Sequence, residues 1–321
     1  MDICVCVKRV PMVGGLIKLT PDGLDIDTAM YGFTISPHEE CAVEEAIQII
    51  ERLAAAAVRS GGAVQVSGAG QAGGAGQAAG AGQAGGAGQA GGAGQSHGAG
   101  GPGGSVTVLT LGPPEAADQL RDMLALGASR AILLETDGAE WGPIATAAAI
   151  TDAVRADRYD LLLFGNESAD TGGYQVPIRV AHALGLPCVT GIKKLQLVAD
   201  PAADPAGVPP GDPSAGGWRI VAGREYRGAE EIFDLPLPAV VSVKEGINLP
   251  RYPSLPGRLR AKRAAIDRVR PQRSADELRK DGLRVPMSSH QRAQILGSGT
   301  GNGTDAVPAL VELLAELGVL P

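Results

Sequence analysis

The chain of 321 residues carries a net charge of −7 at pH 7, and this acidic balance argues against a protein whose main role is to bind nucleic acid. No stretch approaches the ~20 apolar residues that a membrane-spanning helix needs, and the first residues lack the basic region and apolar block of a signal peptide. A cytoplasmic protein is therefore expected. The four cysteines form no Cys-x-x-Cys pair and the four histidines have no metal-ligand spacing, so no metal site is expected.

The first elements in the chain are a buried strand and a long helix. Residues 2–7 (DICVCV) are typical of a buried strand, and 8–34 of a long loop or small hairpin. Residues 36–59 form the clearest helical pattern, because apolar side chains recur there every three or four positions. Ser36 and Glu39 have the spacing of a capping box, which places the helix start at this point.

Residues 61–104 have low complexity. Glutamine recurs there every six residues in a background of Gly and Ala that contains no Asp, Glu, Lys or Arg. Such a segment has too little large apolar surface to offset the entropy of ordering it. We expect a disordered insertion and assign it no function.

Strands and helices then alternate regularly. Strands are predicted at 105–112, 130–136, 160–165 and 187–192, with helices at 113–127, 142–156 and 175–185. This order predicts an α/β fold with a parallel sheet and right-handed crossovers. In such sheets ligands bind beyond the carboxyl ends of the strands, near the point where the strand order switches.

The alternation stops after residue 193. Residues 194–200 and 217–226 resemble the two strands of a hairpin, and 237–246 a further strand. The basic run 258–273 follows, and a short amphipathic helix is predicted at 306–318.

The loop after residue 165 is the best candidate for an anion site, although the chain has no Walker A, Gly-x-Ser-x-Gly or Gly-x-Gly-x-x-Gly sequence. Asp170, Thr171, Tyr174 and Gln175 supply polar side chains, while Gly172-Gly173 lets backbone N–H groups approach an anion before a helix N-terminus. From these residues alone, a plain polar connection at the sheet edge is an equal alternative. Lys8 and Arg9 bring two cations to the same edge, either as solvated charges or beside a ligand.

Several blocks, taken in order, resemble the beta subunit of electron transfer flavoprotein. They are CVCVKRVP, SPHEECAVEEAIQI, LGASRAILLE, DLLLFGNESAD and LPLPAVVSVKEGINLPRYPSLPGRLRAKR. The last is the most specific, because Pro238-Ala239-Val240-Val241 and Asn248-x-Pro250-Arg251-Tyr252-Pro253 recur in it in order. The resemblance covers nearly the whole chain except the insertion, the loop near 199–216 and the far C-terminus.

This resemblance implies a Rossmann-like nucleotide-binding fold of the adenine nucleotide alpha hydrolase-like type. It would comprise 1–60 and 105–257, followed by an arm and short helix at 258–321 that contact the alpha subunit. The resemblance also implies a heterodimer with FAD near its interface, and AMP in the beta subunit or a second FAD in bifurcating members. Acyl-CoA or other flavin dehydrogenases would donate electrons, and a quinone oxidoreductase or another acceptor would receive them. No acid–base or nucleophilic catalytic residue is expected.

The resemblance places the nucleotide contacts mainly at the ends of several strands. They are Cys6, Lys8, Arg9, Val10, Pro11, Ser36, His38, Thr110, Leu111, Gly112, Asp170, Thr171, Gly172, Gly173, Tyr174, Gln175 and Val176. Ser36 replaces the family's usual Asn, and His38 stands where an aromatic residue usually approaches the flavin bound by the alpha subunit. His38 is either a residue that tunes the flavin or a plain surface histidine.

The loop 170–177 differs from both known loop types. It shares Gln175 with both and Val176 with the bifurcating type, and Pro177 replaces Gly and so removes one N–H donor. Because the bifurcating pattern is incomplete, AMP is favoured over a second FAD.

The family's loop for recognising dehydrogenases corresponds to a stretch that carries Gly228, Ala229, Glu230, Glu231 and Ile232. Arg227 stands where an acidic residue is common, and Glu230 stands near the family's exposed Leu, so partner choice is expected to differ. The basic residues 258–263 are expected to pair with an acidic alpha surface rather than nucleic acid. The alternatives of another class are an enzyme or sensor that uses the loop for ATP, and a structural partner whose nucleotide site has decayed.

Overall fold

The computed structural model describes residues 1–14, 17–61, 103–200, 217–275, 280–285, 295–297 and 303–319. The chain divides into two compact units, Met1–Gly15 with Thr28–Lys280 and Leu16–Asp27 with Asp281–Pro321. The expected disordered insertion lies outside the described residues, apart from its first residue and its last two.

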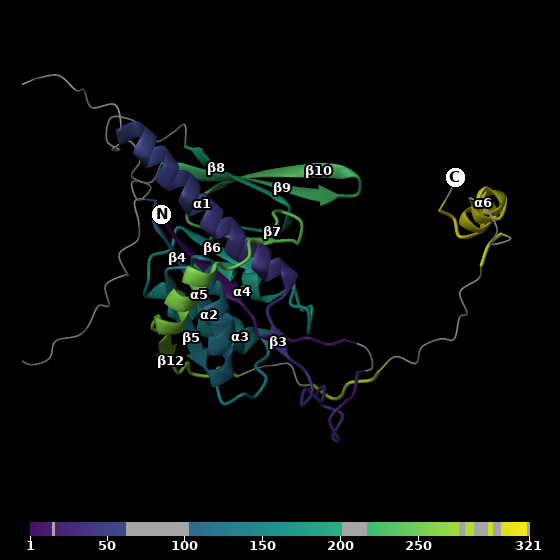
Figure 1. Cartoon of the computed structure of the whole chain (residues 1–321), viewed down its shortest axis with the longest axis horizontal. Helices are drawn as coiled ribbons and strands as arrows, with labels where there is room; N and C mark the ends of the chain where they lie inside the picture. Colours follow the sequence, from purple (N-terminus) through teal and green to yellow (C-terminus); the bar gives the residue numbers. More distant parts are fainter. Residues whose placement is uncertain are drawn as a thin grey trace, which may run out of the picture. The chain divides into compact units, whose positions relative to one another are not determined.

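The first unit is built on a seven-stranded parallel sheet in the order β12-β5-β4-β1-β6-β11-β7 (Figure 1). Its strands are β1 (Asp2–Val7), β4 (Ser105–Gly112), β5 (Arg130–Glu135), β6 (Leu161–Gly165), β7 (Cys188–Ile192), β11 (Ala239–Val243) and β12 (Asp267–Val269). The predicted α/β fold is confirmed. The central strands are mostly apolar, as expected where helices cover both faces of a sheet.

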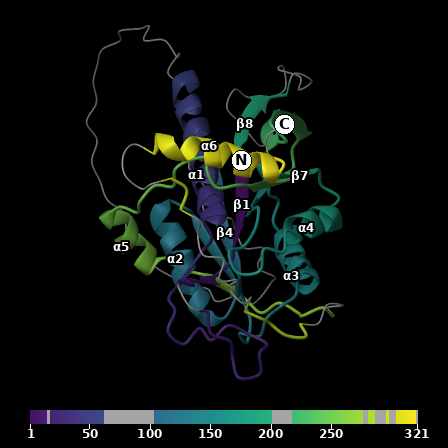
Figure 2. The same ribbon diagram turned by 90° about the vertical axis from the view of Figure 1, so that its right-hand side faces the viewer.

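The helices divide between the two faces, as Figure 2 shows for α2 and α3 on either side of β1 and β4. They are α1 (Pro37–Gly61), α2 (Ala117–Leu126), α3 (Pro143–Arg155), α4 (Val176–Leu184) and α5 (Leu255–Arg263). Alternate residues of β1 define the faces: Val5 and Val7 pack with α1 and α2, whereas Cys4 and Cys6 pack with α3 and α4. This alternation is the period of two that a strand imposes.

A second, antiparallel sheet consists of β8 (Lys194–Ala199), β9 (Trp218–Tyr226) and β10 (Ala229–Pro236). The predicted pairing of 194–200 with 217–226 is confirmed. In the stretch expected to recognise dehydrogenases, Arg227 and Gly228 form a turn, with φ of 49° and 79°, and Ala229–Ile232 belong to β10. From Glu230 to Pro236, exposed residues alternate with less exposed ones, which is the pattern of a strand with one face toward solvent. The stretch pairs along its length with β9.

The basic run 258–273 lies in the first unit, and the position 257/258, where the arm was expected to begin, falls inside α5. Gly257 of α5 faces α2 so closely that an added Cβ would lie 2.4 Å from the Ala125 carbonyl oxygen. Beyond α5, β12 pairs with β5, and Asp267 accepts a hydrogen bond from Arg130 at 2.8 Å. Small residues of α5 and charged residues of β12, rather than large apolar side chains, make these contacts, so hydrophobic periodicity did not reveal them.

The remaining elements are short. They are β2 (Val10–Pro11), β3 (Phe33–Thr34), the 3₁₀ turns η1 (Pro114–Ala116) and η3 (Thr304–Ala306), and the predicted helix α6 (Val307–Glu316) in the second unit. Within the described ranges, no helix is both long enough and apolar enough to cross a membrane.

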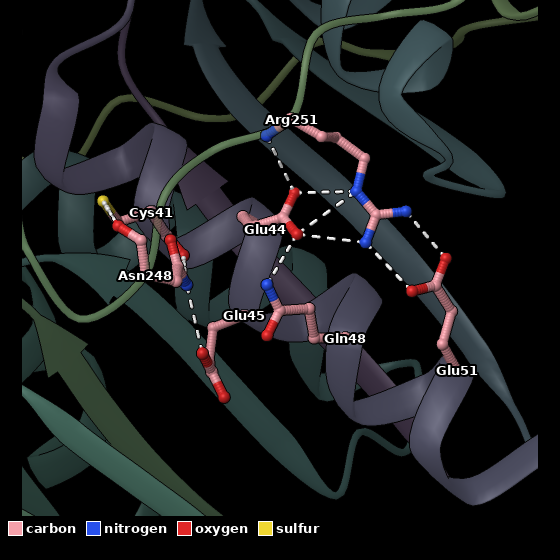
Figure 3. Close-up of polar contacts among 7 residues, drawn as sticks. All are labelled: Cys41, Glu44, Glu45, Gln48, Glu51, Asn248 and Arg251. Carbon is pink, nitrogen blue, oxygen red and sulfur yellow. Dashed lines mark hydrogen bonds and ion pairs between the residues drawn. The ribbon is translucent and has the colours of Figure 1, made fainter. Parts of the chain in front are cut away.

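A polar cluster, which we call the α1 clamp, fixes residues 248–251 to helix α1 (Figure 3). Arg251 donates to Glu44 at 2.9 Å and to Glu51 at 2.7 Å, and its backbone N–H also donates to Glu44. Asn248 donates to Glu45 Oε2 and to the Cys41 carbonyl oxygen, both at 3.0 Å. The clamp thus joins the segment after β11 to helix α1.

Arg251 sets the ionisation of this cluster. Burial alone would raise the pKa of Glu44, whose side chain is only 3% exposed, but hydrogen bonds from Arg251 and Gln48 hold it below its usual value. Hydrogen bonds from Arg251 also lower the pKa of Glu51. Both carboxylates are therefore charged at neutral pH, and Glu44 depends on Arg251 for compensation in a buried position.

Candidate functional site

The strand order switches at β1. The chain passes from β1 to β4 and then β5 on one side, and returns to β6 on the other side of β1. At such a switch the connections after the two neighbouring strands diverge and leave room for a ligand. Lys8 follows β1 and the loop 166–175 follows β6, so the predicted site residues on these two segments meet at this point.

Lys8 and the loop are in direct contact. Lys8 Nζ lies 2.6 Å from Asp170 Oδ2 and donates to Thr171 Oγ1 at 3.3 Å. Within the loop, the Ser168 and Thr171 hydroxyls are 2.9 Å apart, and the Gly172 N–H donates to the Ser168 carbonyl oxygen at 3.0 Å. Burial would raise the pKa of Asp170, but the charge and hydrogen bond of Lys8 lower it overall. Asp170 is thus ionised, and it neutralises much of the positive charge of Lys8.

The tip of the loop is open and locally strained. Gly172 and Tyr174 have φ of 52° and 55°, a region that favours glycine and costs a tyrosine about 1 kcal/mol or more. A Cβ added at Gly173 would have no atom within 4 Å, and the Tyr174 side chain is exposed. The loop therefore presents backbone and an aromatic side chain outward, as a ligand loop does.

Helix α4 begins at this loop without a side-chain cap. Gln175 is the residue before the helix, and its side chain does not cap the first N–H groups. Instead the Gln175 Oε1 atom accepts two hydrogen bonds from Arg179, from Nε at 3.2 Å and from Nη2 at 2.9 Å. Sequence reasoning missed Arg179, although its spacing of four from Gln175 on a predicted helix was a usable signal.

The start of α1 also packs against the loop. The Ser36 hydroxyl donates to the Glu167 carbonyl oxygen at 3.2 Å rather than capping its own helix, and His38 Nε2 lies 3.6 Å from Glu167 Oε1. His38 Nδ1 is buried and has no hydrogen-bond partner within the described part of the chain. Gly165 allows this approach, because a Cβ there would lie 2.6 Å from the Glu39 Cγ atom.

Glu39 is a buried carboxyl group behind Lys8 that sequence reasoning treated only as a capping residue. It is 6% exposed, and its carboxylate accepts hydrogen bonds from the backbone N–H groups of Ser36, at 3.2 Å, and Lys8. Desolvation outweighs these hydrogen bonds and the charge of Lys8, and raises the pKa of Glu39 to about 8. Of the predicted capping box, the hydrogen bond from the Ser36 N–H to the Glu39 side chain forms, and it is buried, whereas the Ser36 hydroxyl bonds elsewhere.

The other predicted contacts lie around this centre. Thr110, Leu111 and Gly112 end β4 beside β1, and the Thr110 hydroxyl is buried with no partner among the residues that the structure describes. Arg9 stacks on Phe33, its Cζ 3.2 Å from the ring centroid, and burial lowers its pKa. Cys6 and Val10 are both buried. Pro11 is half-buried in β2, and Val176 opens α4.

The predicted recognition residues lie on the antiparallel sheet instead. Glu230 pairs with Lys194 at 2.6 Å, and Glu231 pairs with Arg224 at 2.6 Å. Ile232 is 60% exposed on the same strand. Gly228 forms the tip of the turn and Ala229 begins β10, so these five residues occupy one end of a hairpin.

The residues at the switch point fit an anionic nucleotide. The open loop, the uncapped start of α4 and the cation Arg179 supply donors, while the Thr110 hydroxyl and His38 Nδ1 are buried polar atoms without partners. In the described ranges, no group of three or more His, Cys, Asp or Glu side chains is arranged to hold a metal ion. The arrangement suits binding through hydrogen bonds and charge.

Comparisons with known proteins agree in naming one family. The model of the electron transfer flavoprotein domain matches residues 92–274. The chain is 30% identical to an electron transfer flavoprotein subunit beta of Mycobacterium tuberculosis, over 83% of this chain and 77% of that one. It is 28% identical to the subunit beta of Syntrophomonas wolfei, over 83% and 78%, and 26% identical to the mitochondrial subunit beta of Oryza sativa, over 88% and 86%.

Proposed function

Because this chain belongs to the electron transfer flavoprotein family as a beta subunit, we propose that it binds AMP at the switch point and shares an FAD with an alpha subunit. Beta subunits of this family are components of electron carriers and not enzymes, and their family implies an alpha-subunit partner. When bound, the flavin supplies the redox chemistry, and the protein sets its position and surroundings. The carrier would work in the cytoplasm.

One observation carries the AMP proposal: the loop 170–175 stands against Lys8 at the switch in strand order. Gln175 and the start of α4 would hold the phosphate end of the nucleotide, with Lys8 shaping the loop through Asp170. Thr110–Gly112 would line the other side of β1. Ser36 would fix the start of α1, and His38 would face the flavin.

The composition of the purified heterodimer tests this proposal. The chain is co-expressed with its alpha subunit, and FAD and AMP are quantified per heterodimer. One FAD and one AMP would support the proposal. Two FAD would indicate a bifurcating type, for which the loop has an incomplete pattern. Failure of the subunits to co-purify would contradict the carrier function, and ATP turnover by the chain alone would favour an ATP-using enzyme.

A Gln175→Ala variant tests the placement of the phosphate site. We expect about tenfold weaker nucleotide binding, because the amide that orients Arg179 and precedes α4 is lost, with the interface FAD unchanged. Nucleotide content after gel filtration measures the effect. The matched control is Gln196→Ala on β8, which is exposed on the other sheet and should change neither content. Unchanged AMP in Gln175→Ala would place the phosphate elsewhere.

The partners of the carrier would be chosen by two exposed surfaces. On the hairpin, Ile232 with the paired Glu230 and Glu231 would meet the dehydrogenases, whether acyl-CoA dehydrogenases or other flavin enzymes. A quinone oxidoreductase would then accept the electrons. On α5, four exposed cations have no ion pair among the described residues, and with the rest of 258–321 they would meet an acidic surface of the alpha subunit: Arg258, Arg260, Lys262 and Arg263.

A further inference from the structure

Two cations, Lys8 and Arg179, adjoin the candidate nucleotide site, and they differ in whether a carboxylate neutralises them. Lys8 Nζ is 2.6 Å from the Asp170 carboxylate, with Glu39 hydrogen-bonded to the Lys8 backbone. An anion that approached Lys8 would have to displace Asp170 or share Lys8 with it, against the repulsion of that carboxylate. Lys8 therefore contributes little net attraction for a phosphate.

Arg179 is the other cation, and its charge is not neutralised. It lies in the first turns of α4, its side chain is exposed, and within the described part of the chain it has no ion pair with a carboxylate. Its guanidinium is held instead by the neutral amide oxygen of Gln175, through Nε and Nη2. An amide oxygen orients the group without cancelling its charge.

The remaining hydrogen atoms of this guanidinium suit a phosphate. Five N–H donors are present on an arginine, and Gln175 takes two of them, which leaves both Nη1 hydrogens and one on Nη2. A planar fork with adjacent free donors binds two oxygens of one phosphate at once. Gln175 also restricts the side chain before any ligand arrives, so less entropy is lost on binding.

We infer that Arg179, and not Lys8, is the residue that meets the phosphate charge of the nucleotide, with Gln175 as its positioning residue. This inference rests on the proposed nucleotide site and adds to it the residue that distinguishes a nucleotide from a nucleoside. Lys8 then acts on the shape of the loop through Asp170 and Thr171.

The affinities of AMP and adenosine for the heterodimer, measured after its own nucleotide has been removed, distinguish the role of Arg179 from that of Lys8. We expect Arg179→Gln to bind AMP about 30- to 100-fold more weakly and adenosine within threefold of the wild type, because only AMP carries the phosphate. Lys8→Gln should weaken AMP by less than fivefold. Arg179→Lys keeps the charge but loses the fork, and should fall between Arg179→Gln and the wild type.

Arg155→Gln on α3 is the matched control, because Arg155 is exposed and, within the described residues, donates a hydrogen bond to a backbone carbonyl oxygen, that of Ala183. The interface FAD content of each variant reports that the heterodimer is intact. If Arg179→Gln kept the wild-type ratio of AMP to adenosine affinity, or if Lys8→Gln abolished that ratio, the inference would be overturned while the nucleotide site stood. A wild-type heterodimer that bound neither compound would overturn both.

Discussion

A Glu39→Gln variant is expected to be more stable than the wild type at pH 9 and nearly equal to it at pH 5. Glu39 is buried, and desolvation raises its folded-state pKa to about 8 from the ordinary 4.5. Between these two values the folded state holds a proton that the unfolded state has released. Stability therefore falls as the pH rises through this window, and it falls no further above pH 8.

The magnitude follows from the width of the window. Each pKa unit corresponds to about 1.4 kcal/mol, so ionising Glu39 costs the wild type on the order of 5 kcal/mol at pH 9. A glutamine resembles the neutral carboxyl group in shape and does not titrate, so the variant escapes this cost. Lys8 and Asp170, which face Glu39, are unchanged in both proteins.

Denaturant unfolding at pH 5, 7 and 9, followed by far-ultraviolet circular dichroism, measures the difference. The wild-type midpoint should decline between pH 5 and 9 more steeply than that of the variant. Glu312→Gln on the exposed face of α6 serves as the control for loss of a carboxylate, and should follow the wild type. Parallel pH profiles for wild type and Glu39→Gln would show that Glu39 is not a buried titrating group.

An Arg251→Met variant is expected to lose about 3 kcal/mol of unfolding free energy at pH 7. Removing one partner of a buried ion pair leaves the other charge uncompensated, which typically costs ~3–5 kcal/mol. We expect the lower end of that range, because Arg251 is itself 34% exposed and water can reach its place. Glu44, with 3% of its side chain exposed, is the carboxylate that would be left behind.

The effect should depend on pH in the acid range. Arg251 lowers the folded-state pKa of Glu44 and Glu51, so their contribution is present above the ordinary value near 4.5 and is lost as the pH falls through the lowered values. The difference in unfolding free energy between wild type and Arg251→Met should therefore be smaller at pH 3 than at pH 7. Lys193→Met, which breaks the exposed pair with Glu225, should cost only about 0.5 kcal/mol. An equal loss in both variants would show that the clamp is no stronger than a surface ion pair.

The sequence predicted the elements whose cores are large and apolar. The predicted strand 105–112 is the observed β4 residue for residue, because Val, Leu and Thr, which favour strands, fill a short run bounded by Gly. In contrast, α5 and β12 were missed, since Gly257 and Ala261 make the buried contacts of α5 and arginines flank them. Strand β10 was missed because its glutamates are satisfied by cations on neighbouring strands, which no local pattern reveals.

The sequence indicated where the candidate site residues would gather, but not which of their charges would be neutralised by neighbours. Parallel topology alone brings the ends of β1 and β6 together, so Lys8 and the loop 170–175 were expected at one edge. The pairing of Lys8 with residues 163 positions away depends on tertiary packing, as does the burial of Glu39 under Gly165. Local sequence fixes which groups are present, whereas the packing decides which of their charges remain available to a ligand.

The position of β12 also has a consequence for the synthesis of this chain. Asp267, which anchors β12 to β5, emerges from the ribosome 137 residues after its partner Arg130. Until then β5 is an edge strand whose backbone donors and acceptors are free to pair with another chain. A nascent or truncated chain that stops before residue 267 would therefore carry an unpaired strand edge, able to associate with other chains, that β12 covers in the full-length chain.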